Sequence, residues 1–359
     1  MHILCMCSFG LNRSKFCAML LSLYGYTTQY AGINAQAPNP VSCAHLHNAQ
    51  HIICMRPPIY EAFTQQYTTK KPVTILDIND NYKRYDTQAQ HIAQQNIWHF
   101  QYRYVYTQIW EQVQQFVLST PVYRQWKHPT SQELAYIKSV EIAVSFLLYH
   151  HKDLIRTILV KGSFVRREMN KKSDIDVVVI LKHNKDIMML QQWVQTYKEL
   201  FNPVEFSIYS LYEIQRNKKS KQRNDKKLTS PHTNDQLQHI MHIWGKHLYV
   251  TTYPKRSAQQ RYRGLQHAFI KDFIPLYYKG EFTFSSFVKC VLWLAEYEQQ
   301  TQGKQPSATW QQLATTLPKN HIGKLAYEYR MHPVKDVAIK HAFVKKVESY
   351  LSSSFDKQE

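Results

Sequence analysis

The 359-residue sequence has no uninterrupted apolar run near the roughly 18 residues that a membrane-spanning helix needs. Cysteines are few and unevenly spread: there are six, and five lie within the first 54 residues, which does not fit a disulfide framework. No basic segment precedes the first apolar run, and Arg13 and Lys15 interrupt it, so no signal peptide is expected. These absences predict a reduced, cytoplasmic setting and no membrane partner.

Acidic residues are scarce relative to basic ones, at 26 Asp and Glu against 45 Lys and Arg, for a formal net charge of +19. Most of the excess lies in the later two thirds of the chain. A field of this sign attracts nucleic acid, nucleotides and phosphorylated substrates, although net charge alone does not choose among them. Hydrophobic residues make up 44% of the chain and charged residues 20%, so the chain is expected to fold rather than remain disordered.

At this length the chain is expected to form more than one domain. Its patterns indicate a strand-and-helix part, a proline-flanked linker, a mixed-sheet part and a helical part. The expected boundaries are 1–118, 119–129, 130–255 and 256–359. The first part alternates apolar strand candidates, at 3–7, 51–55 and 73–78, with helical stretches, which is typical of a parallel sheet. The predicted fold class is therefore α/β plus α+β, followed by a helical section.

Local patterns predict several further elements. Thr130 and Glu133 form a capping-box pattern that indicates the start of a helix. The apolar face of this helix is expected to contain Leu134, Ile137, Val144 and Leu148. A long helix is expected from about 87 to 118, strands at 157–161, 174–181 and 204–210, and a helix at 186–201. The helical part has two apolar faces, one at Phe287, Cys290, Val291 and Leu294 and the other at Val337, Val344, Val347 and Leu351.

The segment between the first strand and the first helix begins with a cysteine. Five residues separate Cys7 from Arg13, and a hydroxyl residue, Ser14, comes next. This arrangement suits cleavage of a phosphate monoester, because a thiolate attacks phosphorus while loop N–H groups, the helix N-terminus and a guanidinium hold the other oxygens. Gly10 would let the backbone approach the phosphate closely. The simpler alternative is that Cys7 is a buried strand residue and Arg13 a cation at a helix start.

Four short strings accompany this loop: Ile-Leu-Cys-Met-Cys at 3–7, Asn-Arg-Ser at 12–14, Ile-Ile-Cys-Met at 52–55 and Leu-Asp-Ile-Asn-Asp-Asn-Tyr at 76–82. Together they resemble the low-molecular-weight protein tyrosine phosphatase superfamily. The resemblance implies that Cys7 is the nucleophile, Arg13 the phosphate clamp and Ser14 the hydroxyl that steadies the thiolate. It also implies that Gly10 and Asn12 belong to the loop that binds a phosphorylated substrate.

The general acid of that family is an aspartate on a late loop, usually followed by a proline, and it protonates the leaving oxygen. Asp80 is the first candidate for this role and Asp77 the second. The sequence departs from the family at two positions: Asn81 stands where that proline is usual, and Lys15 replaces the proline that commonly follows Arg-Ser. A degenerate module that binds phosphate without hydrolysing it is the alternative.

A second stretch with chemical potential begins at Gly162 and reads Gly-Ser-Phe-Val-Arg-Arg-Glu-Met-Asn-Lys-Lys-Ser-Asp-Ile-Asp, followed by an apolar strand candidate. Asp174 and Asp176 are two residues apart, so both side chains are expected on one face of that strand. Paired carboxylates can hold Mg²⁺ or Mn²⁺, and Glu205 on a neighbouring strand candidate would supply a third group for a two-metal site. Gly162 and Ser163 can bind nucleotide phosphates. The simpler alternative is a solvated acidic turn.

Taken whole, this string resembles the minimal nucleotidyltransferase group of the polymerase-β-like superfamily, over about residues 130–252. Arg166 and Glu168 stand where that group often has Arg and Glu, whereas Arg167 replaces the glycine that usually follows the arginine. The resemblance implies Mg²⁺-dependent transfer of NMP from an NTP to an acceptor hydroxyl, with release of pyrophosphate. Arg166 is then expected to contact the substrate.

The sequence thus predicts a nucleotidyltransferase fused to a phosphatase-like domain, with an NTP and an RNA or protein acceptor as partners. Three alternatives stay open: a small-molecule nucleotidyltransferase with a catalytically dead phosphatase domain, an enzyme that nucleotidylates a partner protein, and a non-catalytic nucleic-acid-binding protein. Basic residues crowd the segment 216–227. They can hold an RNA backbone or a triphosphate, or they can form a solvated loop.

Overall fold

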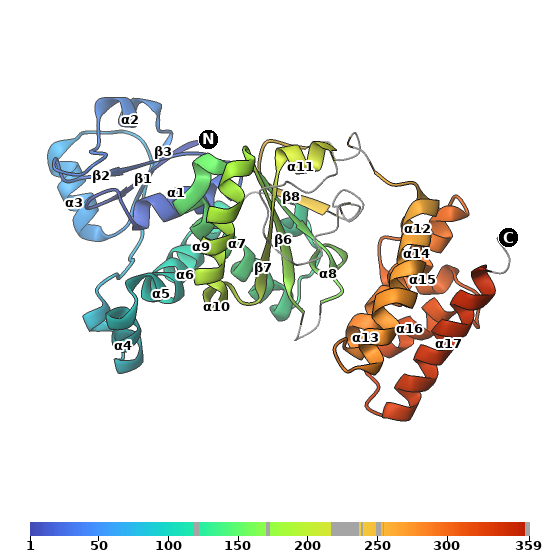
Figure 1. Ribbon diagram of the computed structural model, residues 1–359. Coiled ribbons are helices and arrows are strands. Elements are labelled where there is room, and N and C mark those ends of the chain that lie inside the picture. Colours follow the sequence, from blue (N-terminus) through green and yellow to red (C-terminus); the bar gives the residue numbers. More distant parts are fainter. Residues whose placement is uncertain are drawn as a thin grey trace. The chain divides into compact units, whose positions relative to one another are not determined.

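The computed structural model describes residues 1–117, 122–169, 173–216, 237, 240–248, 253 and 255–355. By residue contacts the chain divides into two compact units (Figure 1). The first contains the described residues up to Gln215 together with 240–248, and the second is made mainly of those from 253 onward. Within the described part of the chain, no helix has the length and apolar character needed to cross a membrane.

The first sheet consists of four parallel strands in the order β2-β1-β3-β4. The strands are β1 (His2–Cys7), β2 (Thr27–Gly32), β3 (His51–Cys54) and β4 (Val73–Ile75). β1, β3 and β4 coincide with predicted strands. β2 has no counterpart among the predictions, because it begins with the polar residues Thr27, Thr28 and Gln29 and lies at the sheet edge with partly exposed side chains.

The helix expected from residue 87 to 118 is interrupted. The helices and turns of this part are α1 (Arg13–Leu23), α2 (Cys43–Asn48), α3 (Pro57–Gln66), η1 (Tyr82–Arg84), α4 (Thr87–Gln95), α5 (Ile97–Phe100), the π-helical η2 (Gln101–Val105), α6 (Tyr106–Gln112), η3 (Gln114–Phe116) and η4 (Val122–Gln125). Asn96 has an extended backbone, and its side chain accepts hydrogen bonds from the N–H groups of Trp98 and His99. Because this asparagine caps a new helix, α4 ends before it.

The second sheet has the order β7-β6-β5-β8 and is mixed. β6 is parallel to β7, whereas β5 is antiparallel to both β6 and β8. The strands are β5 (Ile155–Lys161), β6 (Ile175–Leu181), β7 (Val204–Ser210) and β8 (Ile240–Gly245), the last of which has no counterpart among the predictions. The helices and turns are α7 (Ser131–His151), η5 (Lys152–Leu154), α8 (Ser163–Arg166), η6 (Asn184–Asp186), α9 (Ile187–Thr196), α10 (Lys198–Phe201) and α11 (Leu211–Arg216).

Helix α7 begins with the predicted capping box. The Thr130 hydroxyl accepts from the Glu133 N–H at 3.2 Å, and the Glu133 carboxylate accepts from the Thr130 N–H at 2.7 Å. Three of the expected core residues are buried: Ile137, Val144 and Leu148. Leu134, the fourth, is 43% exposed, because in this first turn Glu133 faces the protein and binds Arg167.

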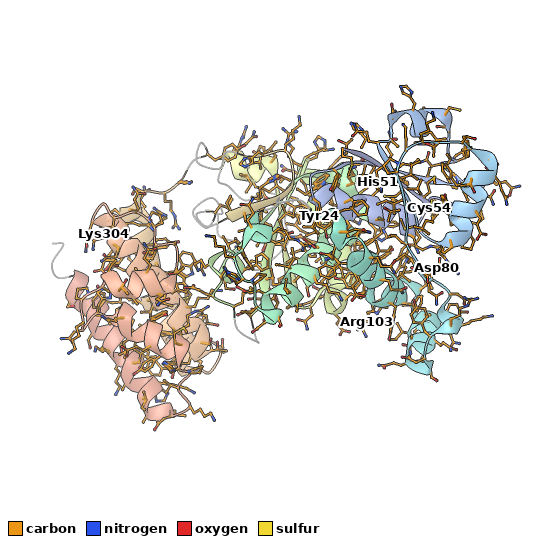
Figure 2. All side chains as sticks on the ribbon, turned by 180° about the vertical axis from the view of Figure 1, so that it is seen from behind. Tyr24, His51, Cys54, Asp80, Arg103 and Lys304 are labelled. Carbon is orange, nitrogen blue, oxygen red and sulfur yellow. The ribbon has the colours of Figure 1, made fainter. Side chains whose placement is uncertain are left out.

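Helix α7 also joins the two sheets into one hydrophobic core. Its Glu141 is fully buried and accepts hydrogen bonds from Tyr24 at 3.0 Å and Trp110 Nε1 at 2.6 Å (Figure 2 labels Tyr24). Tyr123 and Arg124 complete the contacts of this carboxylate, at 3.1 Å and 2.7 Å. Both belong to the predicted linker, so this part of the linker is packed into the first unit. The division of this unit into two domains, one for each sheet, stays a prediction from the sequence.

The second unit is helical. Its elements are α12 (Ala258–Ala268), the π-helical η9 (Phe269–Phe273), α13 (Ile274–Tyr278), α14 (Phe284–Thr301), α15 (Trp310–Thr316), α16 (Ile322–Met331) and α17 (Val337–Phe355). The predicted apolar faces supply its core, with Phe287 and Val291 of α14 packed together with Val344 and Val347 of α17. Val337 is 60% exposed because it is the first residue of its helix. A parallel sheet, a mixed sheet and a helical part confirm the predicted fold class in outline.

Candidate active sites

The loop between β1 and α1 has a backbone path that requires glycine at residue 10. Gly10 has φ +69°, and a Cβ placed there would lie 2.6 Å from the Gly32 nitrogen and 2.8 Å from the Ala31 carbonyl carbon. Since these are backbone atoms of the neighbouring strand β2, they cannot move aside. The sequence therefore folds the loop tightly against the sheet edge and places Cys7 at its start.

The side chain of Cys7 is nearly buried and lies among hydrogen-bond donors. Its Sγ is 3.1 Å from the Ser14 hydroxyl, and the Gly10 N–H donates to it at 3.2 Å. The Gly10 N–H is a donor in its contact, whereas either the Ser14 hydroxyl or the thiol can donate in the other. The structure thus brings together Cys7, Gly10 and Ser14, three residues that the sequence assigned to one site.

Arg13 and Asp80 form an ion pair beside this loop, with Arg13 Nε 3.0 Å from Asp80 Oδ2 (Figure 2 labels Asp80). A second Arg13 nitrogen donates to the Ile78 carbonyl at 3.2 Å, and the arginine is 7% exposed. Asp77 is exposed, and its main chain is hydrogen-bonded to Gln112 at both N–H and carbonyl. Of the two candidate acids, Asp80 is therefore the one that contacts a residue of the loop.

Residues from outside the loop hold its outer half in place. The Tyr106 hydroxyl donates to Asn12 Oδ1 at 2.8 Å, so this asparagine is engaged in supporting the loop. The Tyr149 hydroxyl of α7 donates to the Leu11 carbonyl at 2.6 Å, and Lys15 lies 4.4 Å from the centre of the Tyr149 ring. Burial raises the pKa of Tyr149 to about 12, so its hydroxyl stays protonated at neutral pH. No pattern in the sequence signalled Tyr106 or Tyr149, because they lie 94 and 138 residues away from their partners in the loop.

The second candidate site is the turn between β5 and α8. Gly162 has φ +78°, and a Cβ placed there would lie 2.8 Å from Asp176 Oδ2. The cause is the antiparallel register, which pairs Lys161 with Asp176 and places the carboxylate beside the turn. Gly162 and Ser163 are half-buried, so their N–H groups lie near the surface. The turn and the aspartate that the motif groups together are therefore in contact.

The three predicted metal-binding carboxylates share a region of the second sheet. Asp176 and Glu205 are register partners on the parallel strands β6 and β7, so their side chains leave the sheet on the same face. Asp174 lies one residue before β6; it and Glu205 are exposed, and Asp176 is half-buried. Among the residues that the structure describes, no three His, Cys, Asp or Glu side chains are gathered closely enough to hold an ion. The backbone brings these three residues together, but their side chains do not converge.

Arg166, the predicted substrate contact, is turned into the protein. It is 7% exposed, and its Nε lies 3.0 Å from Glu168 Oε2. The neighbouring Arg167 has φ +57°, in the left-handed region that glycine adopts at less cost than other residues. Its guanidinium donates to both Glu133 oxygens, at 2.7 and 2.9 Å, and lies 5.1 Å from the Trp126 ring centre. This bidentate pair offsets the cost of the left-handed backbone, and the motif alone gave no signal of it.

Most of the predicted basic segment 216–227 lies outside the described residues, which include only Arg216 of it.

The family model of a nucleotidyltransferase domain matches residues 128–246, about a third of the chain. The matched segment contains the Gly162 turn and all three carboxylates. A nucleotidyltransferase domain therefore lies in this part of the first unit.

A solved spectinomycin adenyltransferase from Enterococcus faecialis, determined with ATP and spectinomycin, is similar in structure with a TM-score of 0.41 and 13% sequence identity. The similarity covers 62% of this chain and 99% of that one. No curated protein matches the sequence. The likeness of residues 1–118 to tyrosine phosphatases stays a prediction from the sequence.

Proposed function

We propose that this protein is a Mg²⁺-dependent nucleotidyltransferase that moves NMP from an NTP to an acceptor hydroxyl. One observation carries the proposal: within the matched segment, the Gly162 turn lies against Asp176, and Asp176 is the register partner of Glu205. A phosphate-binding turn and acidic side chains on one sheet face are the two parts that such a transfer requires.

The donor chemistry of this sheet face fits a divalent cation. Asp174, Asp176 and Glu205 offer only carboxylate oxygens, the ligands that Mg²⁺ and Mn²⁺ prefer. These three residues would hold the ion. When bound, a divalent ion would neutralise triphosphate charge and make the acceptor hydroxyl easier to deprotonate.

The chain's own residues bind and orient the nucleotide. The N–H groups that follow Gly162 and the Ser163 hydroxyl hold the β- and γ-phosphates, and the left-handed Gly162 keeps that turn open to them. Arg166 is buried and contacts Glu168, so its role is to support the turn rather than to touch the nucleotide. The acceptor is RNA or protein in the leading version of this proposal and a small molecule in the alternative.

The test is label transfer from each of four α-³²P-labelled NTPs into RNA, protein and small-molecule pools, with Mg²⁺ or Mn²⁺. We expect incorporation into one pool from one preferred NTP. Asp174→Asn and Asp176→Asn should abolish it, whereas Glu199→Gln, which also removes an exposed acid of this unit, should leave it unchanged. Absence of incorporation from every NTP into every pool would contradict the proposal.

A second function is favoured by the contacts at the Cys7 loop. The Cys7 thiol is hydrogen-bonded to Ser14 and Gly10, and the same loop contains Arg13, which pairs with Asp80. In this proposal the Cys7 thiolate attacks the phosphorus of a phosphomonoester, and the oxygen of the leaving group departs with a proton from Asp80. Water then attacks the phosphocysteine, which releases inorganic phosphate and restores the thiolate. Arg13 must exchange its contact with Asp80 for the phosphate oxygens.

Hydrolysis of aryl phosphates tests this second function. Cys7→Ser should abolish it, and Cys43→Ser, the same change at an exposed cysteine, should not. Asp80→Asn should slow the hydrolysis of an alkyl phosphate more than that of p-nitrophenyl phosphate, because a good leaving group needs less protonation. If wild-type protein binds phosphate at this loop but hydrolyses neither substrate, the site is a phosphate-binding module only.

A further inference from the structure

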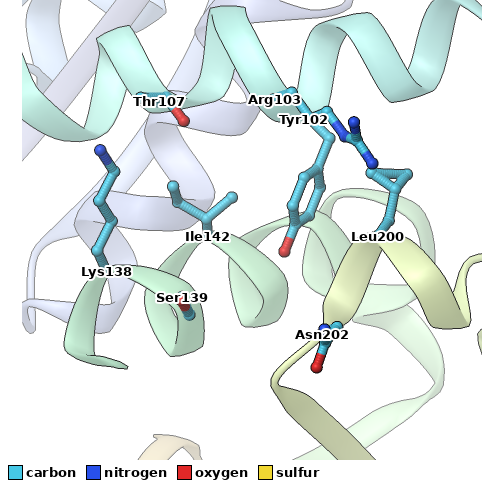
Figure 3. A pocket seen from close by; sticks show the side chains of 8 residues that line it. All are labelled: Tyr102, Arg103, Thr107, Lys138, Ser139, Ile142, Leu200 and Asn202. Atoms are coloured by element: carbon cyan, nitrogen blue, oxygen red, sulfur yellow. The ribbon is translucent and has the colours of Figure 1, made fainter. Parts of the chain in front are cut away.

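A pocket lies between helix α7 and the segment formed by η2 and α6, away from the residues of both candidate active sites (Figure 3). Its volume is about 230 Å³. Tyr102, Arg103 and Thr107 line one side, and Lys138, Ser139 and Ile142 of α7 line another. Leu200 and Asn202, at the end of α10, close it. All eight residues belong to the first unit.

The charge of this pocket has one sign: two of its eight lining residues are basic and none is acidic. Arg103 is exposed, and among the residues that the structure describes none holds its guanidinium by a hydrogen bond or an ion pair. The same guanidinium contributes to the lowered pKa of His99, next to the main effect of burial. Within the described part of the chain, its positive charge is therefore not neutralised by a partner.

Lys138 stands at the other end of the pocket, beside Thr107 (Figure 3). Its Nζ lies 2.8 Å from Glu111 Oε1, but the Glu111 side chain is 55% exposed. Ion pairs with so exposed a partner stabilise little and exchange readily. An anion in the pocket can therefore replace Glu111 as the partner of the Lys138 ammonium.

The walls of the pocket are fixed by packing, so the site exists before a ligand arrives. The Tyr102 ring contacts Phe146 and Phe201, with ring centres 5.5 and 6.0 Å apart. Burial raises the pKa of Tyr102 far above its usual value, so the hydroxyl keeps its proton and can donate it to an anion. Ile142 and Leu200 are buried and give the pocket an apolar base.

We propose that this pocket binds a small phosphate-bearing anion through Arg103, Lys138 and the Tyr102 hydroxyl. The volume is below the ~300–1,000 Å³ of sites for drug-sized ligands, which favours a compact anion such as inorganic phosphate or pyrophosphate. Three donors from two elements, Tyr102 and Arg103 of η2 and Lys138 of α7, suit a tetrahedral group with several oxygens better than a planar carboxylate. This binding site does not depend on either proposed reaction.

Calorimetric titration of the full chain with pyrophosphate tests the proposal, in metal-free buffer so that the three carboxylates repel the ligand. The Cys7 loop is a second possible phosphate site, and Arg13→Gln removes its clamp. We expect a binding event that persists in Arg13→Gln and weakens at least about 10-fold in Arg103→Gln/Lys138→Gln. The charge-matched control Lys83→Gln/Arg84→Gln, two exposed residues of η1, should bind like wild type.

Tyr102→Phe separates a built site from attraction by net charge alone, because it removes a single hydroxyl and leaves every charge in place. It should weaken the binding of pyrophosphate several-fold, and urea midpoints should confirm that each variant is folded. Parallel titrations with inorganic phosphate and AMP show whether the preferred anion is free or carried on a nucleotide. Affinity that is unchanged in both the double variant and Tyr102→Phe, or lowered equally by the control pair, would overturn the proposal.

Discussion

At the Cys7 loop a thiol contacts a hydroxyl at 3.1 Å and a guanidinium contacts a carboxylate at 3.0 Å, whereas at the Gly162 turn three carboxylates share a sheet region without converging. Both turns connect a strand to a helix and both require glycine with positive φ. They differ in the charges of their side chains. Arg13 and Asp80 attract each other, but Asp174, Asp176 and Glu205 repel one another.

The contacts of the first candidate site form within the protein alone, whereas the carboxylates of the second would need a ligand to gather. Opposite charges and hydrogen-bond donors can assemble without a cation, so the pairs at the Cys7 loop form in the free protein. Like charges gather only when a cation offsets their repulsion. We therefore expect metal dependence at the Gly162 turn and none at the Cys7 loop.

The network of contacts around the buried Glu141 gives the largest expected effect. Glu141→Ala would leave Arg124 buried without its carboxylate and would free the donors of Tyr24, Trp110 and Tyr123. We expect the free energy of unfolding of the first unit to fall by about 3–5 kcal/mol. Urea denaturation measures it, with Glu111→Ala at the exposed Lys138 pair as the control that changes by less than about 1 kcal/mol. Equal effects of the two variants would show that the Glu141 network does not stabilise the unit.

Asp176→Asn should separate the two sites functionally. Removal of one charge from the acidic face should lower NMP transfer at least about 10²-fold, since this aspartate is proposed to hold the cation. Hydrolysis at the Cys7 loop should be unchanged. Parallel assays of both activities on one preparation measure this, and an equal loss of both would contradict independent sites.

The two glycines provide a matched pair. In Gly10→Ala the new methyl meets backbone atoms of β2, so we expect a loss of about 2–3 kcal/mol in stability. In Gly162→Ala the methyl meets the end of the Asp176 side chain, which can rotate, so about 1–2 kcal/mol is expected, mainly from the positive φ. Its larger consequence is a displaced carboxylate and weaker NMP transfer. Urea denaturation measures the losses in stability, and label transfer measures the loss of NMP transfer. The comparison would be contradicted if Gly162→Ala proved more destabilising than Gly10→Ala.

The Glu133–Arg167 pair predicts a small effect of pH. Hydrogen bonds from Arg167 hold the pKa of Glu133 below its usual value, so this contribution to stability is present near neutral pH and is lost as the pH falls through the lowered pKa. Arg167→Gln should therefore cost up to about 1 kcal/mol at pH 7 and progressively less below pH ~4. Denaturation at several pH values measures this difference, and a cost that grows on acidification would be contradictory.

The motifs predicted contacts between residues that lie close together in the sequence. Cys7, Gly10 and Ser14 lie within eight residues of one another, and Gly162 and Asp176 belong to one string, so strand-to-helix and strand-to-strand geometry alone brings each group together. The capping box of α7 is equally local, and the structure contains it.

Contacts between distant segments could not be predicted in this way. The Glu141 network draws on α1, α6, η4 and α7, and the proline-flanked segment with Tyr123 and Arg124 has the composition of a linker. The edge strand β2 is too polar for an apolar-run criterion. The left-handed backbone of Arg167 is stabilised by Glu133, 34 residues earlier, which no single-sequence pattern encodes.

Mn²⁺ binding followed by electron paramagnetic resonance, with a non-hydrolysable NTP analogue present, tests the central claim most directly. Wild-type protein should bind Mn²⁺ together with the analogue, Asp174→Asn/Asp176→Asn should bind it at least about 10-fold more weakly, and Glu199→Gln should match wild type. If the double aspartate variant holds Mn²⁺ and the analogue as tightly as wild type, the sheet face beside Gly162 is not the metal site and the proposed transfer mechanism is wrong.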